Sequence, residues 1–316
     1  MAARTQLSGA VDAALRKGIL VAADSSSIRR VVRSHGMRFG AGRFVAGETL
    51  DECVAVLRRL NEQGLYANTT LLGEGVLEPG ETEGVVRAYR EIIDRIADEK
   101  LRANVALKLT HLGLDVDEDL ALRNVRELVE HAASRDNFIR IDMEQSSYVE
   151  ATLKIYRRLR EDGLDSVGTV LQSYLYRTPD DLESLLPLVP NLRLVKGAYL
   201  EPHDVAYAHK AEVDDAYARL MERMLTDGGH TAIATHDDRL IERAIAFTNE
   251  HGIDRERFEF QMLYGVRSNL QLDLVRRGYK VLVATPFGPD WYPYLMRRLG
   301  ERPANLLFFA RAAVTR

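Results

Sequence analysis

Cysteine is nearly absent from this sequence, which contains Cys53 alone among 316 residues. A single cysteine forms no intrachain disulfide, so the chain makes no demand for an oxidising compartment. Cys53 falls within a helical pattern, where a packed thiol is a better interpretation than a nucleophile. The cysteine content therefore fits a cytoplasmic protein.

Long apolar runs and excess positive charge are also missing. No stretch approaches the roughly 18 apolar residues of a membrane-spanning helix. The first twenty residues interleave Arg4, Asp12 and Lys17 with short apolar groups, and lack the continuous apolar centre of a secretory signal. A net charge of −4 provides no basic field for nucleic acid. We therefore expect a cytoplasmic chain with no transmembrane segment and no nucleic-acid partner.

Metal-binding patterns are lacking too. The histidines show no His-Glu-x-x-His or similar ligand spacing. The acidic run from Asp115 to Asp119 resembles the start of a calcium loop, but Leu120 and Arg126 stand where such a loop requires Gly and Glu. We therefore predict no metal, and interpret the acidic run as a solvated loop that caps the following helix.

Short apolar runs alternate with helical patterns along most of the chain, which indicates βα units around a parallel sheet. Eight runs have the continuous apolar character of strands buried on both faces, at residues 65–72, 104–109, 138–143, 167–171, 192–195, 231–234, 258–263 and 280–284. A count of eight favours a closed (β/α)8 barrel of the TIM type, an α/β fold, over an open doubly wound sheet.

The residues before the first predicted strand also have helical patterning, at 10–20, 28–33 and 50–60. They are too few for a separate domain. We predict that residues 1–64 form a helical N-terminal extension packed on a barrel of residues 65–316, together making one structural domain.

Polar side chains stand at the carboxyl ends of several predicted strands, where barrel enzymes carry their active sites. Lys108 interrupts an apolar run, and the same pattern recurs in later strands at Asp142 and Glu144, Gln172 to Tyr174, Arg193 and Lys196, and Thr235 to Asp237. Each alone is equally consistent with a buried ion pair or a strand cap. Together they predict an active site, because interior charges must pair or bind a ligand.

The last helical pattern carries a second cluster. Tyr294, Arg297, Arg298 and Glu301 are spaced i, i+3, i+4 and i+7, so they share one helix face. Two adjacent arginines suit a carboxylate. A solvent-exposed charged stripe is the alternative, but the aromatic neighbourhood around Trp291 favours a binding face.

These motifs resemble the monofunctional, FAD-dependent proline dehydrogenases. The resemblance extends in order from residue 72 to residue 305, through Leu72-Gly-Glu74, Lys108-Leu, Asp142-Met-Glu144, Gln172-Ser-Tyr174, Arg193-Leu-Val-Lys-Gly-Ala-Tyr199, Ala234-Thr-His236, Phe260-Gln-Met-Leu263, Trp291-Tyr-Pro-Tyr-Leu-Met-Arg-Arg-Leu299 and Arg302-Pro-Ala-Asn305.

The resemblance implies oxidation of L-proline to 1-pyrroline-5-carboxylate by hydride transfer to FAD, with a quinone as electron acceptor. Because the implied quinone lies in a membrane, the resemblance adds a membrane-peripheral location to the cytoplasmic one expected above. It assigns catalytic roles to Asp142 and Arg193, with Arg193 beside the flavin N5 and Asp142 tuning the cationic cluster. The remaining cofactor contacts would come from Met143, Gln172, Val195, Lys196, Gly197, Ala198, Thr235 and His236.

The resemblance also implies a substrate site. The proline carboxylate would bind Lys108, Arg297 and Arg298, and the substrate ring would pack among Tyr199, Leu263 and Tyr294. Glu74 would pair with Arg297 to close the site, while Glu301 would orient the arginines.

One position departs from the family pattern. Ala284 stands where proline-preferring members usually carry a tyrosine, near the end of the eighth predicted strand. Alanine leaves space beside the substrate ring, so we expect activity on 4-hydroxyproline as well as proline.

Two alternatives remain open from the sequence. Lys108 or Lys196 on a barrel strand would also suit a Schiff-base lyase of the aldolase kind. The second alternative is a barrel that has lost its activity and only binds a ligand, and Ala284 is the only residue that suggests it.

Overall fold

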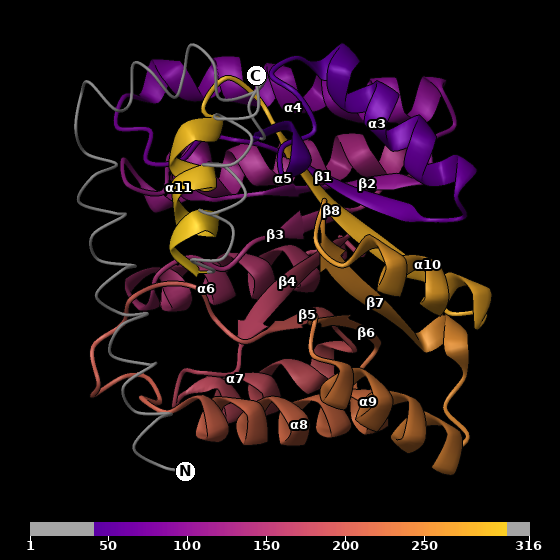
Figure 1. Cartoon of the computed structure of the whole chain (residues 1–316). Coiled ribbons are helices and arrows are strands. Elements are labelled where there is room, and N and C mark those ends of the chain that lie inside the picture. The colour runs from indigo at the N-terminus through magenta and orange to yellow at the C-terminus, as the bar shows by residue number, and fades with distance from the viewer. Residues whose placement is uncertain (1–40, 302–316) are drawn as a thin grey trace.

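The computed structural model describes residues 41–301, which are built around a closed barrel of eight parallel strands in chain order (Figure 1). The strands are β1 (Tyr66–Leu71), β2 (Ala103–Leu107), β3 (Ile139–Ile141), β4 (Val167–Gln172), β5 (Asn191–Val195), β6 (His230–Ala234), β7 (Phe258–Leu263) and β8 (Val281–Phe287). The predicted TIM-type barrel is confirmed. The helical patterns at 10–20 and 28–33 lie outside the described residues.

Helices follow the strands and surround the barrel. They are α4 (Pro79–Asp98), α5 (Glu118–Ser134), α6 (Val149–Glu161), α7 (Thr178–Leu185), α8 (Lys210–Asp227), α9 (Asp238–Glu250) and α10 (Ser268–Arg276). The expected cap at the acidic run is confirmed, because the Asp117 carboxylate accepts a hydrogen bond of 2.8 Å from the Leu120 amide at the start of α5.

Helix α3 (Leu50–Glu62) precedes the barrel and packs against β1 and β8. Thr49 begins it with a capping box, in which its hydroxyl accepts from the Glu52 amide and the Glu52 carboxylate accepts from the Thr49 amide. The predicted helix at 50–60 is thus confirmed. The domain boundary between residues 64 and 65 stays a prediction.

Helix α11 (Trp291–Glu301) follows β8 and stands apart from the helices around the barrel, at the left of Figure 1. It buries an apolar face formed by Trp291, Tyr292, Leu295 and Met296. That face packs against Leu72, which directly follows β1, and against Phe44 and Val45. The Trp291 indole donates a hydrogen bond of 2.5 Å to Glu48. This packing places helix α11 beside the carboxyl end of β1.

Cys53 lies inside α3 and is fully buried, with its sulfur 3.2 Å from the Thr69 hydroxyl. Burial raises the pKa of its thiol to about 12, although the contact with Thr69 acts in the opposite direction. A thiol that stays protonated is a poor nucleophile. The interpretation of Cys53 as a packing residue is confirmed.

The amino-terminal half of the barrel interior is filled by paired polar groups. The Glu259 carboxylate, 3% exposed, lies 2.9 Å from the Lys280 ammonium and 3.5 Å from the His230 imidazole. Burial alone would raise the pKa of Glu259, but these two partners hold it well below its usual range. Arg140 donates to the Asn191 carbonyl and side chain at 2.8 and 2.5 Å. This layer closes the end of the barrel opposite the predicted active site.

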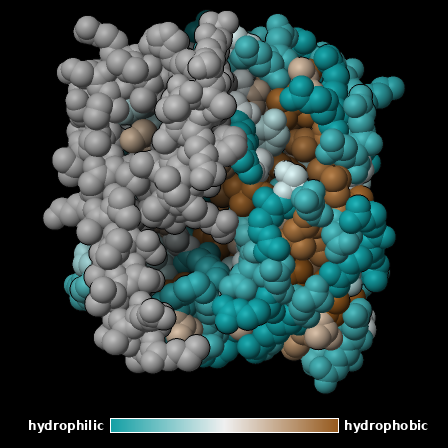
Figure 2. All heavy atoms as spheres, in the orientation of Figure 1, coloured by the Kyte–Doolittle hydropathy of each residue, from teal (hydrophilic) through white to brown (hydrophobic). Residues whose placement is uncertain are grey.

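The described surface is mainly hydrophilic on the face drawn in Figure 2, with a band of apolar atoms between the hydrophilic parts. Among residues 41–301, no helix combines the length and the apolar character that crossing a bilayer requires.

Candidate active site

Arg193 forms the centre of the polar cluster at the carboxyl ends of the strands. It projects from β5 and is 8% exposed. One terminal nitrogen donates a 2.8 Å hydrogen bond to Asp142, directly after β3, and the other donates at 2.8 Å to the side-chain oxygen of Asn68 in β1. Its Nε atom is buried with no hydrogen-bond partner among the described residues. Three strands thus fix the guanidinium and leave one donor available to a ligand.

Asn68 is itself anchored across the barrel. It is 1% exposed, and its amide donates a 2.5 Å hydrogen bond to the Asn104 side chain in β2. Asp142 is fixed as well, because its main-chain amide donates to the Leu107 carbonyl at 2.8 Å. The partners of Arg193 are therefore held by their own hydrogen bonds, which preorganises the guanidinium.

Lys108 follows β2 at the mouth of the barrel and forms an ion pair with Glu74 from the loop after β1. Below it, the buried Glu144 carboxylate accepts from the Thr110 hydroxyl at 2.7 Å and from the Thr110 amide at 3.2 Å. Burial raises the pKa of Glu144, although the hydrogen bonds from Thr110 and the charge of Lys108 oppose that change.

Glu74 is expected from the family pattern to pair with Arg297. In this structure its carboxylate contacts Lys108. The side chains of Arg297 and Glu301 lie outside the described part of the chain, so their pairing stays a prediction. Arg298 and Tyr294 are described, and the guanidinium lies 5.5 Å from the centre of the tyrosine ring, as expected for neighbours on one face of α11.

Gln172 ends β4 and points a polar group into the same region. Its amide nitrogen donates to the Glu144 carbonyl at 3.2 Å, whereas its Oε1 atom is buried with no hydrogen-bond partner among residues 41–301. Met143, two residues after β3, is 7% exposed. Gly197 has a φ of +115°, and a Cβ there would overlap the Tyr174 ring. Only glycine allows the chain after β5 to pass this close to the end of β4.

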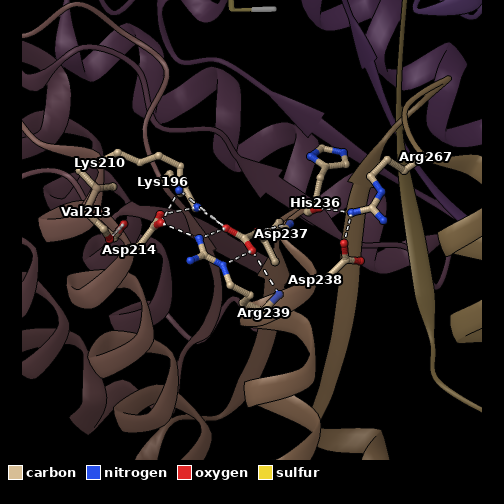
Figure 3. A network of polar contacts seen from close by, with 11 residues as sticks. Lys196, Lys210, Val213, Asp214, His236, Asp237, Asp238, Arg239 and Arg267 are labelled. Atoms are coloured by element: carbon tan, nitrogen blue, oxygen red, sulfur yellow. Dashed lines mark hydrogen bonds and ion pairs between the residues drawn. The ribbon is translucent and has the colours of Figure 1, made fainter. Parts of the chain in front are cut away.

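Lys196 has its ammonium group engaged by carboxylates. It lies 2.5 Å from Asp214 in α8 and 3.4 Å from Asp237 at the start of α9, and Lys210 and Arg239 contact the same two carboxylates (Figure 3). A hydrogen bond from Arg239 is the main cause that lowers the pKa of Asp237 to about 2, against the effect of burial. The ammonium of Lys196 therefore links the ends of β5 and β6.

His236 follows β6 and bridges to the next strand. Its Nε2 atom accepts a 3.0 Å hydrogen bond from the Leu263 amide at the end of β7, which assigns the proton of a neutral imidazole to Nδ1. The His236 carbonyl accepts from Arg267 at 2.8 Å (Figure 3). The Thr235 hydroxyl accepts from the Asp237 amide at 3.2 Å.

Ala284 lies within β8 rather than near its end, because the strand continues to Phe287. It is the register partner of Leu263 on one side and Asn68 on the other. The structure thus brings Ala284 beside one predicted substrate contact and beside the residue that holds Arg193. Tyr199 lies farther out, half-buried in the loop after β5.

Known proteins resemble this chain in both sequence and fold. A sequence model of the proline dehydrogenase family matches residues 53–311. Proline dehydrogenase 1 of Bacillus subtilis subsp. natto is 41% identical over 294 residues, which cover 93% of this chain and 97% of that protein. The proline dehydrogenase of Deinococcus radiodurans is 41% identical over 302 residues, covering 94% and 97%. The chain belongs to the proline dehydrogenase family.

A solved structure agrees with this family assignment. Proline utilization A from Bdellovibrio bacteriovorus, in a form inactivated by N-propargylglycine, superposes with a TM-score of 0.78 at 25% identity. The alignment covers 85% of this chain and 33% of that one. The chain thus spans about a third of proline utilization A, whereas it spans nearly the whole length of its monofunctional relatives.

The lyase alternative is not supported by these comparisons, and the site geometry also argues against it. A Schiff-base lysine attacks a carbonyl through a neutral amine. Lys108 is paired with Glu74, and Lys196 is paired with Asp214 and Asp237. Both side chains are thus engaged by carboxylates, an arrangement that does not favour either lysine as the free amine that such a lyase requires.

Sequence reasoning missed the residues that support the site, above all Asn68, Asn104 and Asp214. Asn68 interrupts a strand-like apolar run, the same signal that singled out Lys108, but it stands in mid-strand rather than at the carboxyl end. Asn104 stands near the start of β2, far from the strand ends where an active site is expected. Asp214 lies in a helix with several acidic residues and has no local signal. Its role depends on a contact with Lys196, 18 positions away along the chain.

Proposed function

We propose that this chain oxidises L-proline to 1-pyrroline-5-carboxylate with FAD as the hydride acceptor. Membership of the proline dehydrogenase family supports the reaction. The observation that carries the assignment to this site is the buried guanidinium of Arg193, held by Asn68 and Asp142 with its Nε donor unpartnered among the described residues. A cation fixed in this way stabilises negative charge that develops on a reduced ring.

The residues at the carboxyl ends of the strands fit a flavin. Gln172 offers a buried acceptor, Oε1, and Arg193 offers a buried donor, Nε, neither with a partner in the described part of the chain. An isoalloxazine ring carries both an N–H donor and several acceptors, so it can satisfy both groups. We assign its binding to these two residues together with Met143, Val195, Lys196, Gly197, Ala198, Thr235 and His236.

The contribution of Lys196 to cofactor binding is not made by its ammonium group alone. Because its ammonium is engaged by Asp214 and Asp237, we propose that it contributes to cofactor binding through its main chain and through the position it gives to the end of β6. Bound FAD supplies the two-electron chemistry, and the protein supplies binding and orientation.

Substrate binding is proposed to begin at Lys108, Arg297 and Arg298, which together suit a carboxylate. Glu74 presently contacts Lys108, so a substrate carboxylate that binds this ammonium must share or replace that contact. Leu263, Tyr199 and Tyr294 are assigned to the ring, and Glu301 to orientation of the arginines. Anchoring a small substrate at one end restricts its reactive carbon to a few orientations.

We further propose that 4-hydroxyproline is a substrate and that a quinone accepts the electrons, in the cytoplasm or at the membrane periphery. Ala284 supports the first proposal, because its small side chain lies beside Leu263 in the barrel register and leaves room for a hydroxyl. Reduction of a soluble quinone analogue during proline turnover tests the second.

The absorbance spectrum of the purified protein tests the main proposal. We expect flavin bands, bleaching of those bands by proline without oxygen, and release of FAD on denaturation. Protein that is colourless, and that remains inactive with proline after reconstitution with FAD, is incompatible with the proposed reaction.

A further inference from the structure

His111 lies beneath the mouth of the barrel, and the proposed reaction gives it no part. It belongs to the short 3-10 helix η2 (Thr110–Leu112), which follows β2 and Lys108. The side chain is 8% exposed, and its Nδ1 atom is buried with no hydrogen-bond partner among the described residues. Burying a polar group without a partner is costly, so hydrogen bonding within the described residues does not account for a histidine at this position.

The imidazole lies directly against the main chain of Gly73. A Cβ atom added to Gly73 would come closer than 3.0 Å to Nε2 and Cε1 of the ring, a separation that real Cβ atoms essentially never show. Gly73 immediately precedes Glu74, the residue that pairs with Lys108. The ring therefore limits how far the chain that carries Glu74 can approach η2.

The same ring contacts a second residue, and nearby hydrogen bonds anchor the loop that carries Gly73. The Tyr89 ring from α4 meets it edge to face, with centroids 6.1 Å apart and an interplanar angle of 76°. The Tyr89 hydroxyl donates to the Leu71 carbonyl at 3.2 Å, and the Val76 amide donates to the Thr110 carbonyl at 3.1 Å. These contacts fix the loop on both sides of Gly73 and Glu74, with the imidazole wedged beneath it.

The imidazole of His111 is uncharged near neutral pH. Burial lowers the pKa of His111 to about 4, and the positive charge of Lys108 acts in the same direction, while Asp290 and Glu74 act against it. An uncharged side chain that makes no hydrogen bond with the described residues acts on its neighbours through its shape.

We propose that His111 is a positioning residue: its imidazole, wedged under Gly73, sets the placement of Glu74 against Lys108 and thereby the affinity for the substrate carboxylate. This inference rests on the proposed function, in which Lys108 binds that carboxylate. His111 touches neither the reacting atoms nor the proposed flavin contacts, so it acts on substrate binding and leaves the chemical step unchanged.

The test is a double-mutant cycle between His111→Ala and Gly73→Ala in the full chain. Each single variant disturbs the contact between the imidazole and Gly73. His111→Ala leaves a gap, and Gly73→Ala inserts a methyl group where the ring lies. We expect each single variant to raise KM for proline by about tenfold with kcat little changed. In the double variant, KM should return most of the way to the wild-type value. His111→Leu, which keeps the bulk without the nitrogens, should rescue the KM lost in His111→Ala.

Binding is measured independently with cyclopentanecarboxylate, which has a five-membered ring and a carboxylate but no nitrogen to be oxidised. Calorimetry should give dissociation constants that follow the KM pattern. His131→Ala is the matched control, because this histidine pairs with Asp94 at 2.9 Å between α4 and α5, on the outside of the barrel. It should lower the melting temperature and leave the dissociation constant unchanged.

Melting temperatures separate positioning from simple packing. If the two substitutions are coupled in melting temperature but not in KM or in the dissociation constant, the proposal is overturned. It is also overturned if His111→Leu binds the probe as weakly as His111→Ala, which keeps the test decisive if the Gly73 variant does not fold. Wild-type protein that binds the probe but does not oxidise proline contradicts the proposed function alone.

Discussion

Replacing Asn68 by alanine tests the support of the central guanidinium. The side chain of Asn68 is buried, accepts from Arg193 at 2.8 Å and donates to Asn104 at 2.5 Å. Alanine removes both contacts and leaves two polar partners inside the barrel. Arg193 keeps its ion pair with Asp142, so its charge remains compensated while its orientation is loosened.

The cost follows from the groups left unpaired. A buried donor or acceptor without a partner costs about 1–3 kcal/mol, and one of the two here belongs to a charged guanidinium. We expect Asn68→Ala to lower the free energy of unfolding by about 2–4 kcal/mol, and the melting temperature by about 3–6 °C for a chain of this size. Loss of orientation at Arg193 should lower kcat for proline by about tenfold or more.

Thermal unfolding, flavin content and proline turnover with an artificial acceptor measure these effects. Asn137→Ala is the matched control, because this asparagine also makes two hydrogen bonds, to Ala103 and Phe138, but lies before β3 at the opposite end of the barrel. The control should lose stability and keep kcat. If Asn68→Ala loses the same stability yet keeps the kcat of the wild type, Asn68 is a packing residue and the reasoning about Arg193 is refuted.

Three further predictions concern the substrate site and its surroundings. Arg298→Met should weaken proline binding by about 2 kcal/mol, or about 30-fold in KM, with FAD content unchanged; unaltered KM in folded protein would show that this face of α11 is merely solvated. Ala284→Tyr should lower the ratio of kcat/KM for 4-hydroxyproline over proline by about tenfold, and an equal ratio in both proteins contradicts the role of Ala284. His111 has a folded-state pKa of about 4 against an ordinary value of 6.5, so its contribution to stability is complete above pH 6.5 and is lost as the pH falls towards 4. Denaturant unfolding at pH 7 and pH 4.5 measures this effect. Between these two pH values the free energy of unfolding should fall less in His111→Leu than in the wild type, by up to about 3 kcal/mol. An equal fall in both proteins would count against a neutral buried imidazole.

Much of the fold was accessible from the sequence because its signals are local. A strand buried on both faces is apolar throughout, so all eight strands could be located within a few residues of their observed ends. The cap at Asp117 and the burial of Cys53 were predictable for the same reason. Strand ends were less predictable, as β8 shows by continuing past Ala284 to Phe287.

Residue patterns along the chain were enough to predict the barrel class, the polar groups at its mouth and, through the order of the motifs, the family. How those groups pair became apparent only in the folded chain. Closure of the barrel brings Asn68 within hydrogen-bond distance of Arg193, 125 positions away in the sequence. It also places Asp214 and Asp237 around the ammonium of Lys196, which the family motif alone would assign to the cofactor. The folded chain likewise sets Glu74 against Lys108 and wedges His111 beneath it. Periodicity and motifs indicate which face of each helix or strand is buried. The partner of a buried charge depends on which strands become neighbours when the barrel closes, and that is not visible in the local sequence.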